Sequence, residues 1–280
     1  MNDYIKQNFQ KERELYGKKD IILVECSFSG EEDGESALKE CENVEALKTT
    51  FALRYPFWHC KNVDIKLSDF TTTCRAPLWY CKGVHIIESN LFGLKALREC
   101  TKIQLDDCKV VSNEFCWKSK NIAIEKGSVE SEYAFFQSKN IKIDDIHFFG
   151  KYSFQYCKNV KIENSVLNTK DAFWHSKDIV LINCVVNGEY LGWYSENLTL
   201  INCKITGTQP LCYCKNVRII NCSMEDCDLA FEYSSVRANI IGKIKSIKNP
   251  KSGKILADYI GEIIITDDSK VKSNAIVLKK

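Results

Sequence analysis

The sequence predicts an all-β protein, a single-stranded parallel β-helix of about twelve coils with a repeat of roughly 19 residues. Two observations predict this fold class. One short motif returns at a nearly constant interval through most of the 280 residues, and apolar and polar residues alternate within each copy. A unit this short cannot bury its own apolar face, so neighbouring units have to stack on one another.

The motif begins with a cysteine or serine and usually continues with a charged residue, an asparagine and an apolar residue. Copies begin at Cys41, Cys60, Cys81, Cys100, Ser119, Ser138, Cys157, Ser176, Ser195 and Cys214. Successive starts lie 19 residues apart, except for the 21 residues between Cys60 and Cys81. Degenerate copies precede them at Lys18 and follow them at Tyr233. The interval indicates one coil per copy.

Alternation identifies the units as strands. Val160 and Ile162 are apolar and are separated by Lys161, which is the period of a strand with one buried face. Long apolar stripes with the helical period are absent. We expect residues 18–250 to form the coils, residues 1–17 an N-terminal lead or cap and residues 251–280 a C-terminal cap, all within one domain that spans 1–280.

Aligned copies also place like residues in columns. Asparagine tolerates left-handed turns and its amide can bond to the same amide one coil away, so it suits a ladder at a bend. The third position of the motif holds Asn43, Asn62, Asn121, Asn140, Asn159, Asn197 and Asn216, and a second column holds Asn164, Asn183, Asn202 and Asn221. Eleven of the 15 cysteines fall in two further columns, which predicts small buried thiols.

Composition excludes several classes of function. With 39 basic and 37 acidic residues, nothing supports a nucleic-acid surface or a membrane anchor. The first residues have no apolar run, so we expect no secretory signal and a cytoplasmic, reducing location. The cysteines lack the paired spacing of a zinc site, and no cofactor motif occurs, so we expect neither a metal nor a cofactor.

All five tryptophans lie in one column, at the penultimate position of a coil: Trp58, Trp79, Trp117, Trp174 and Trp193. The preceding column holds no charged residue, which indicates a core position. Because side chains of a strand alternate in direction, the tryptophans should point outward. Arg98 shares their column, which agrees, since burial of an unpaired arginine is very costly. A row of partly exposed rings is typical of a binding surface.

These columns nominate a binding site. The four candidates for ring stacking are Trp58, Trp79, Trp174 and Trp193, and the candidate polar contacts are Arg54, His59, Arg75, Arg98, Glu99 and His175. Flat rings beside hydrogen-bonding groups suit an oligosaccharide, but they suit a protein partner or a second copy equally well. A column that only stabilises itself by ring stacking needs neither, because aromatic pairs contribute about 0.5–1.5 kcal/mol each.

The phrases KNVKIENSVL, AFWHS and LGWYSENLTLINC, with the ending IKNPKSGKILADYIGEIII, resemble an uncharacterised bacterial family of pectin-lyase-like β-helix proteins. The resemblance covers nearly the whole chain and implies a right-handed helix. It implies no activity, because fold does not carry function.

Three functions remain open at this point. The first is binding of a carbohydrate along the tryptophan column, and the second is a non-catalytic scaffold for protein partners. The third is a polysaccharide lyase or glycoside hydrolase, which needs clustered carboxylates that no motif in the sequence provides. Whether the protein is an enzyme is left open by the sequence.

Overall fold

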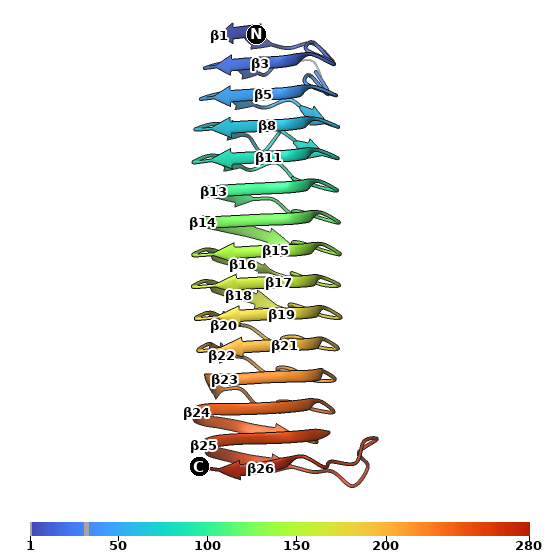
Figure 1. Ribbon diagram of the computed structural model, residues 1–280, viewed down its shortest axis with the longest axis vertical. Coiled ribbons are helices and arrows are strands. Elements are labelled where there is room, and N and C mark those ends of the chain that lie inside the picture. Colours follow the sequence, from blue (N-terminus) through green and yellow to red (C-terminus); the bar gives the residue numbers. More distant parts are fainter. Residues whose placement is uncertain (1, 31–33) are drawn as a thin grey trace. The chain divides into compact units, whose positions relative to one another are not determined.

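The computed structural model describes residues 2–30 and 34–280, and every regular element in this part of the chain is a β-strand. The chain divides into two compact units, Met1–Lys142 and Ile143–Lys280. Strand β15 (Lys139–Asp144) contains the boundary between them. All strand pairings within each unit are parallel, as the β-helix prediction requires, and Figure 1 shows β3, β5, β8 and β11 following one another in chain order.

The strands of the first unit are β1 (Asn2–Ile5), β2 (Asn8–Phe9), β3 (Lys19–Val24), β4 (Ser27–Phe28), β5 (Glu42–Leu47), β6 (Thr50–Phe51), β7 (Phe57–Trp58), β8 (Lys61–Lys66), β9 (Asp69–Phe70), β10 (Leu78–Trp79), β11 (Lys82–Ile87), β12 (Asn90–Leu91), β13 (Thr101–Val111) and β14 (Lys120–Glu132). Those of the second are β16 (His147–Lys151), β17 (Lys158–Glu163), β18 (Val166–Lys170), β19 (Lys177–Ile182), β20 (Val185–Asn187), β21 (Glu196–Ile201), β22 (Lys204–Thr206), β23 (Lys215–Asp226), β24 (Ser235–Lys248), β25 (Ser252–Ile264) and β26 (Ile276–Lys279).

The register of the strands confirms the repeat. Ile179 pairs with Leu198, and Ile103 pairs with Ile122, so residues 19 apart in sequence are direct neighbours in the sheet. The longer interval after Cys60 is also accommodated, because Val63 pairs with Val84. The two extra residues lie between β9 and β10, where the chain makes a wider turn.

The coils number about 14 rather than about twelve. The difference comes from the chain ends, where the repeat is not readable in the sequence. Strands β1 and β2 pair in parallel with β3 and β4, so residues 2–9 already belong to a coil. At the other end β25 pairs with both β24 and β26.

Buried aromatic and aliphatic side chains stack in columns inside each unit. Phe28, Phe51 and Phe70 are fully buried and lie face to face, with ring centroids 5.2 and 4.7 Å apart. In the second unit Phe154 stacks on Phe173 at 4.8 Å. Phe57, Leu78 and Leu211, from the column that precedes the tryptophans, are fully buried as well. Stacking of equivalent residues is therefore how a short unit obtains a core.

The asparagine ladders form as predicted. Asn62 donates to Asn43, Asn140 to Asn121 and Asn216 to Asn197, with distances of 2.8–3.0 Å. In the second column Asn183 donates to Asn164 and Asn202 to Asn183. All of these residues have positive φ, which asparagine tolerates better than most side chains. An aspartate begins three of the ladders as an acceptor: Asp20, Asp144 and Asp178.

All 15 cysteines are buried and none forms a disulfide, which confirms the interpretation as small buried thiols. Their sulfurs lie against backbone carbonyls of the preceding coil, as Cys60 does against Leu38 and Cys214 against Gly192. Serines in the same column make the same contact through a hydroxyl, as Ser119 does with Leu97. A short side chain with a hydrogen-bond donor is thus needed at this bend, and either cysteine or serine provides one.

Candidate functional site

The tryptophan column exists in each unit, and its rings are half-buried rather than fully exposed. Trp58 pairs with Trp79 in the register of β7 and β10, and Trp79 pairs with Arg98. In the second unit Trp174 stacks on Trp193, with centroids 5.3 Å apart and an angle of 6° between the planes. All four are intermediate in exposure, while the residue before each is buried. The predicted alternation of direction is therefore present.

Four of the five tryptophans use the indole N–H inside the protein. Trp79 donates to the carbonyl of Lys95 and Trp117 to that of Tyr133, while Trp174 and Trp193 donate to Tyr190 and Gln209. The acceptor always lies 16 residues further on, in the next coil. Gln155 makes the same contact with Asp171. At these five positions the column ties one coil to the next.

The exception is Trp58, whose Nε1 is buried without a partner among the described residues. The next coil has two extra residues between β9 and β10, in the stretch that contains position 74, which lies 16 residues further on. The sequence signals this difference through the 21-residue spacing.

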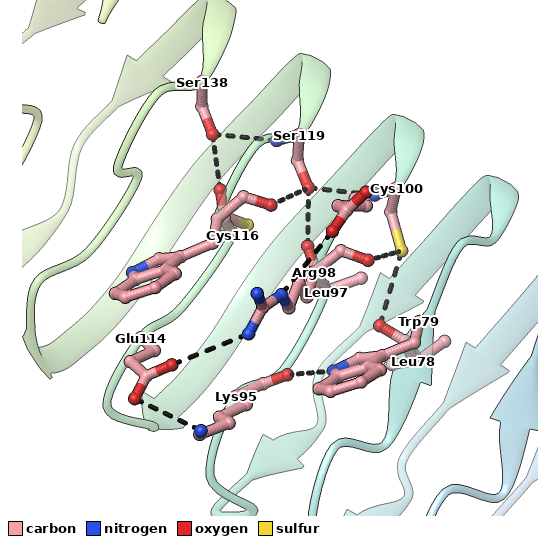
Figure 2. A network of polar contacts seen from close by, with 12 residues as sticks. Leu78, Trp79, Lys95, Leu97, Arg98, Cys100, Glu114, Cys116, Ser119 and Ser138 are labelled. Atoms are coloured by element: carbon pink, nitrogen blue, oxygen red, sulfur yellow. Dashed lines mark hydrogen bonds and ion pairs between the residues drawn. The ribbon is translucent and has the colours of Figure 1, made fainter. Parts of the chain in front are cut away.

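The faces of the tryptophan rings are largely covered. The guanidinium of Arg98 lies 5.2 Å from the ring of Trp79 and 5.4 Å from that of Trp117, and Lys39 lies over Trp58. Figure 2 shows Arg98 reaching toward Glu114, which also contacts Lys95 at 3.4 Å. Cation–π contacts of this kind contribute about 0.5–2 kcal/mol each. Arg98 therefore occupies the place that a ligand stacked on these two rings would take.

A second row of exposed rings stands one position later, in the last column of the coils. We call Tyr156, His175, Tyr194 and Tyr213 of the second unit the ring ladder. Tyr156 and Tyr194 are 50% and 46% exposed. Neighbouring centroids are 4.8–5.1 Å apart and neighbouring planes differ by 5–13°. His175 and Tyr194 thus have a ring on either face, and it is their edges that meet solvent.

The backbone explains why these rings point outward. Tyr156, His175, Tyr194 and Tyr213 all have φ between 53° and 61°, in the left-handed region. So do residues two positions earlier, such as Phe173 and Leu211. Repeated left-handed residues bend the chain at each coil and direct alternate side chains in and out. Non-glycine residues rarely adopt this conformation, and stacking in columns offsets its cost.

The first unit contains a shorter pair of the same kind, His59 on Tyr80, at 4.8 Å and 10°. The other predicted polar contacts of that unit are placed as follows. Arg54 pairs with Glu35 at 2.8 Å, Glu99 lies 3.7 Å from Arg98, and Arg75 is exposed. The structure thus brings Trp58, Trp79 and His59 together in one unit and Trp174, Trp193 and His175 in the other.

Charges border the ring ladder. Lys170 pairs with Glu189 at 2.8 Å, and this contact raises the pKa of the lysine. Burial raises the pKa of the neighbouring Asp171 carboxyl. At one end of the ladder, burial and then the Glu232 carboxylate raise the pKa of Tyr213 to about 12, and the Tyr213 hydroxyl donates to Glu232. The surroundings of the ladder are polar and nearly balanced in charge.

Sequence reasoning missed two features. The column after the tryptophans supplies three of the predicted contacts, His59, Glu99 and His175, but the prediction does not include its tyrosines. His85 was not singled out at all, yet its two ring nitrogens lie 3.2 Å from Asp64 and 2.9 Å from Asp106. The outward position of His85 between two aspartates one coil away on either side was the signal that could have found it. Among the described residues, no cluster of three His, Cys, Asp or Glu has the arrangement of a metal site.

The described part of the chain contains no helix long and apolar enough to cross a membrane.

A family model matches residues 2–278, which is nearly the whole chain; it is described as a protein of unknown function, DUF3737. The chain belongs to the DUF3737 family. This confirms the prediction of an uncharacterised family, while the pectin-lyase-like relation, the right-handed winding and the bacterial source stay predictions. No curated protein matches the DUF3737 chain.

Two solved structures are similar to the DUF3737 chain at low identity. One is HetL from the cyanobacterium Nostoc, a pentapeptide repeat protein involved in regulation of heterocyst differentiation. It is 11% identical with a TM-score of 0.27, over 80% of this chain and 91% of that one. The other is the Streptococcus pneumoniae surface protein and adhesin PfbA, also 11% identical with a TM-score of 0.27, over 94% and 77%. Similarity at this level supports no argument about function.

Proposed function

We propose that this DUF3737 chain is a non-catalytic interaction module that binds a protein partner through the ring ladder. The observation that carries the proposal is the face-to-face stacking of Tyr156, His175, Tyr194 and Tyr213, with edges exposed to solvent. Rings held in this way lose little conformational entropy when a partner binds them. Tyrosine, with tryptophan and arginine, is also the residue type that contributes most to protein interfaces.

The same stacking weakens the carbohydrate hypothesis at this surface without removing it. A sugar that stacks on an aromatic ring needs an open ring face, and His175 and Tyr194 have both faces covered. The faces of Trp174 and Trp193 lie against each other in part. A glycan would therefore have to contact the edges, through the tyrosine hydroxyls and the imidazole nitrogens. Carbohydrate binding by hydrogen bonds to the ladder is our second candidate.

Two substitutions of one residue distinguish the candidates. Tyr194→Ala removes the ring and opens a gap in the ladder, whereas Tyr194→Phe removes only the hydroxyl. Binding of a protein that packs on the rings should weaken strongly in the first variant and little in the second. Binding of a glycan that bonds to the edges should weaken strongly in both. Tyr259→Ala is a matched control, since Tyr259 is 52% exposed in the same unit but has no ring contact within the ladder.

The experiment compares the four chains as immobilised baits for proteins of the source cell and as probes of a glycan array. Partners retained by the wild type and by Tyr259→Ala but lost with Tyr194→Ala are then purified, and their dissociation constants are measured. We expect the constant to rise by at least about tenfold with Tyr194→Ala. The proposal fails if every retained protein binds Tyr194→Ala as well as it binds the wild type.

A further inference from the structure

A surface depression separate from the ring ladder lies on the outward face of four strands in the first unit. A depression of about 550 Å³ opens over β8, β11, β13 and β14, and we call it the sheet hollow. Its polar lining includes Asn62, Asp64, His85, Lys102, Gln104 and Asn121. The volume falls in the range of small-molecule sites, about 300–1,000 Å³. This site involves none of the ring ladder.

The sheet hollow exists because two columns are interrupted there. The asparagine ladder that joins Asn43 to Asn62 stops at Gly83 and resumes only at Asn121, which accepts from Asn140. Gly83 has no side chain, and a Cβ placed there would meet Oδ1 of Asn62 at 3.0 Å. In the neighbouring column Gln104 of β13 pairs with Ala123 of β14, so the end of the hollow at β14 is lined by a short side chain.

The interruption leaves hydrogen-bonding atoms without their usual ladder partners. Within a ladder, Asn183 shows the usual pattern: its amide donates to Asn164 one coil before it and accepts from Asn202 one coil after it. Oδ1 of Asn62 would accept from position 83, and Nδ2 of Asn121 would donate to position 102. A glycine and a lysine occupy those positions, so the hollow has a free acceptor at one end and a free donor at the other.

Between these ends a rigid polar group occupies the centre. His85 contacts Asp64 and Asp106, and Nε2 of Gln104 donates to the same oxygen of Asp106 at 3.0 Å. The imidazole is thereby held in one orientation, together with two carboxylates and one amide. A second depression of about 390 Å³ shares Asp64 and continues toward Glu45 and Lys66. The surface that continues in the direction in which the coils stack is mixed, since Ile22, Val24 and Leu47 also line this second depression.

We propose that the sheet hollow binds a neutral polyhydroxylated ligand, one or two units of an oligosaccharide. Each hydroxyl group of a sugar both donates and accepts, and the lining offers acceptors (Asn62, Asp64) and donors (Asn121, Lys102) in close alternation. One carboxylate, Asp64, and one ammonium group, Lys102, line the hollow, so their charges balance and the hollow does not select a strongly charged ligand. Binding by hydrogen bonds at a preformed polar site is how such ligands are oriented.

A substitution at Gly83 should block the sheet hollow. Gly83 has φ +73°, which asparagine tolerates, so Gly83→Asn should restore the ladder by donating to Asn62 and fill the hollow. Gly17→Asn is the matched control, because Gly17 has φ +67° and open space around a Cβ. Ala123→Lys would fill the hollow from the other side without touching a glycine.

Binding is measured by titrating the chain at constant pH with the neutral disaccharides cellobiose, maltose and lactose, while the histidine ring signals are followed by NMR. The chain has only four histidines, so these signals can be resolved. We expect a saturable shift of His85 with at least one disaccharide, unchanged in Gly17→Asn. The apparent dissociation constant should rise at least about tenfold in Gly83→Asn and in Ala123→Lys.

The inference is overturned if no disaccharide shifts His85 saturably, or if the two filling variants bind as well as the wild type. A shift confined to His59 or His175 would also overturn it, since that result points to the exposed rings. Failure here leaves the ring-ladder proposal intact, because Tyr194→Ala tests a different surface. The signals of His59, His147 and His175 report whether each variant remains folded.

Discussion

Many individual side chains in this protein bond to or pack against the next coil. The tryptophans illustrate this, since four of them place an indole N–H on a backbone carbonyl 16 residues further along the chain. Arg98 fills the gap between Trp79 and Trp117. A side chain at one of these positions is therefore part of the coupling between coils, even where one edge of it is exposed.

Trp174→Phe should lower the free energy of unfolding by about 1–3 kcal/mol, because the carbonyl of Tyr190 loses its donor. Trp58→Phe is the control: it makes the same change in ring size, but its buried Nε1 has no partner to lose. Removing that unsatisfied group should cost little or even stabilise the protein. Urea unfolding of both variants measures the difference, and equal losses would contradict this account of the column.

Stability should fall steeply in alkaline solution. Burial raises the pKa of Cys41, Cys214 and Cys227 to about 12, whereas unfolded thiols ionise near 9.0. Between these values the unfolded chain has released protons that the folded chain keeps, so rising pH favours unfolding. The loss approaches about 1.4 kcal/mol per pH unit for each such thiol.

Urea midpoints measured from pH 8 to pH 11 test this dependence. Cys214→Ser should flatten the curve by one thiol's contribution without other damage, because Ser195 and Ser234 occupy the same column. A midpoint that does not change over this range would show that the thiols ionise as readily in the folded chain as in the unfolded one.

At the scale of the coil, the asparagine ladders join a backbone requirement to a side-chain bond. Asn183 has φ 54°, donates to Asn164 at 3.1 Å and accepts from Asn202 at 3.3 Å. Glycine would satisfy the backbone alone, and alanine would satisfy neither the backbone nor the bonds. The two contributions can therefore be separated by substitution at one position.

We expect Asn183→Ala to destabilise the protein more than Asn183→Gly, by about 1–2 kcal/mol, which is the cost of a Cβ in the left-handed region. Asn183→Gly should itself be less stable than the wild type, since two ladder bonds are lost. Asn183→Asp should keep the bond from Asn202, as Asp178 does for Asn197. If Asn183→Gly has the same urea midpoint as the wild type, the ladder bonds contribute nothing to stability.

Much of the coil could be predicted from the sequence because its columns repeat. Asparagines, thiols and phenylalanines recur at one interval, and that interval fixes their neighbours. Two things could not be predicted. The angle between stacked rings depends on the left-handed backbone at positions such as Tyr194. The residue types at these positions do not indicate that conformation. The sheet hollow exists because Gly83 lacks the side chain that the asparagine column has elsewhere. In the sequence, such an interruption only makes the repeat less regular and does not indicate a hollow.

At the scale of the whole molecule, stability should be a sum over coils and their contacts with neighbours. The described residues within each unit make their sheet contacts with the coil before or after. Removing one complete coil therefore removes the contribution of that coil to stability. The two coils on either side then come into contact, and their equivalent residues still align. Removing part of a coil shifts every later column by the missing residues and exposes the core residues of the following strands.

Deletion of residues Lys177 to Ser195, one full repeat, tests the column arrangement most directly. Glu196 then takes the place of Lys177, with which it pairs in register, and Tyr213 follows His175 in the ring ladder. We predict a folded, all-β chain by circular dichroism, with its remaining thiols still unreactive toward a thiol reagent. A partner deletion of Lys177 to Val185 should unfold. If the full-repeat deletion loses its structure as completely as the partial one, equivalent residues do not stack coil upon coil and the account is wrong.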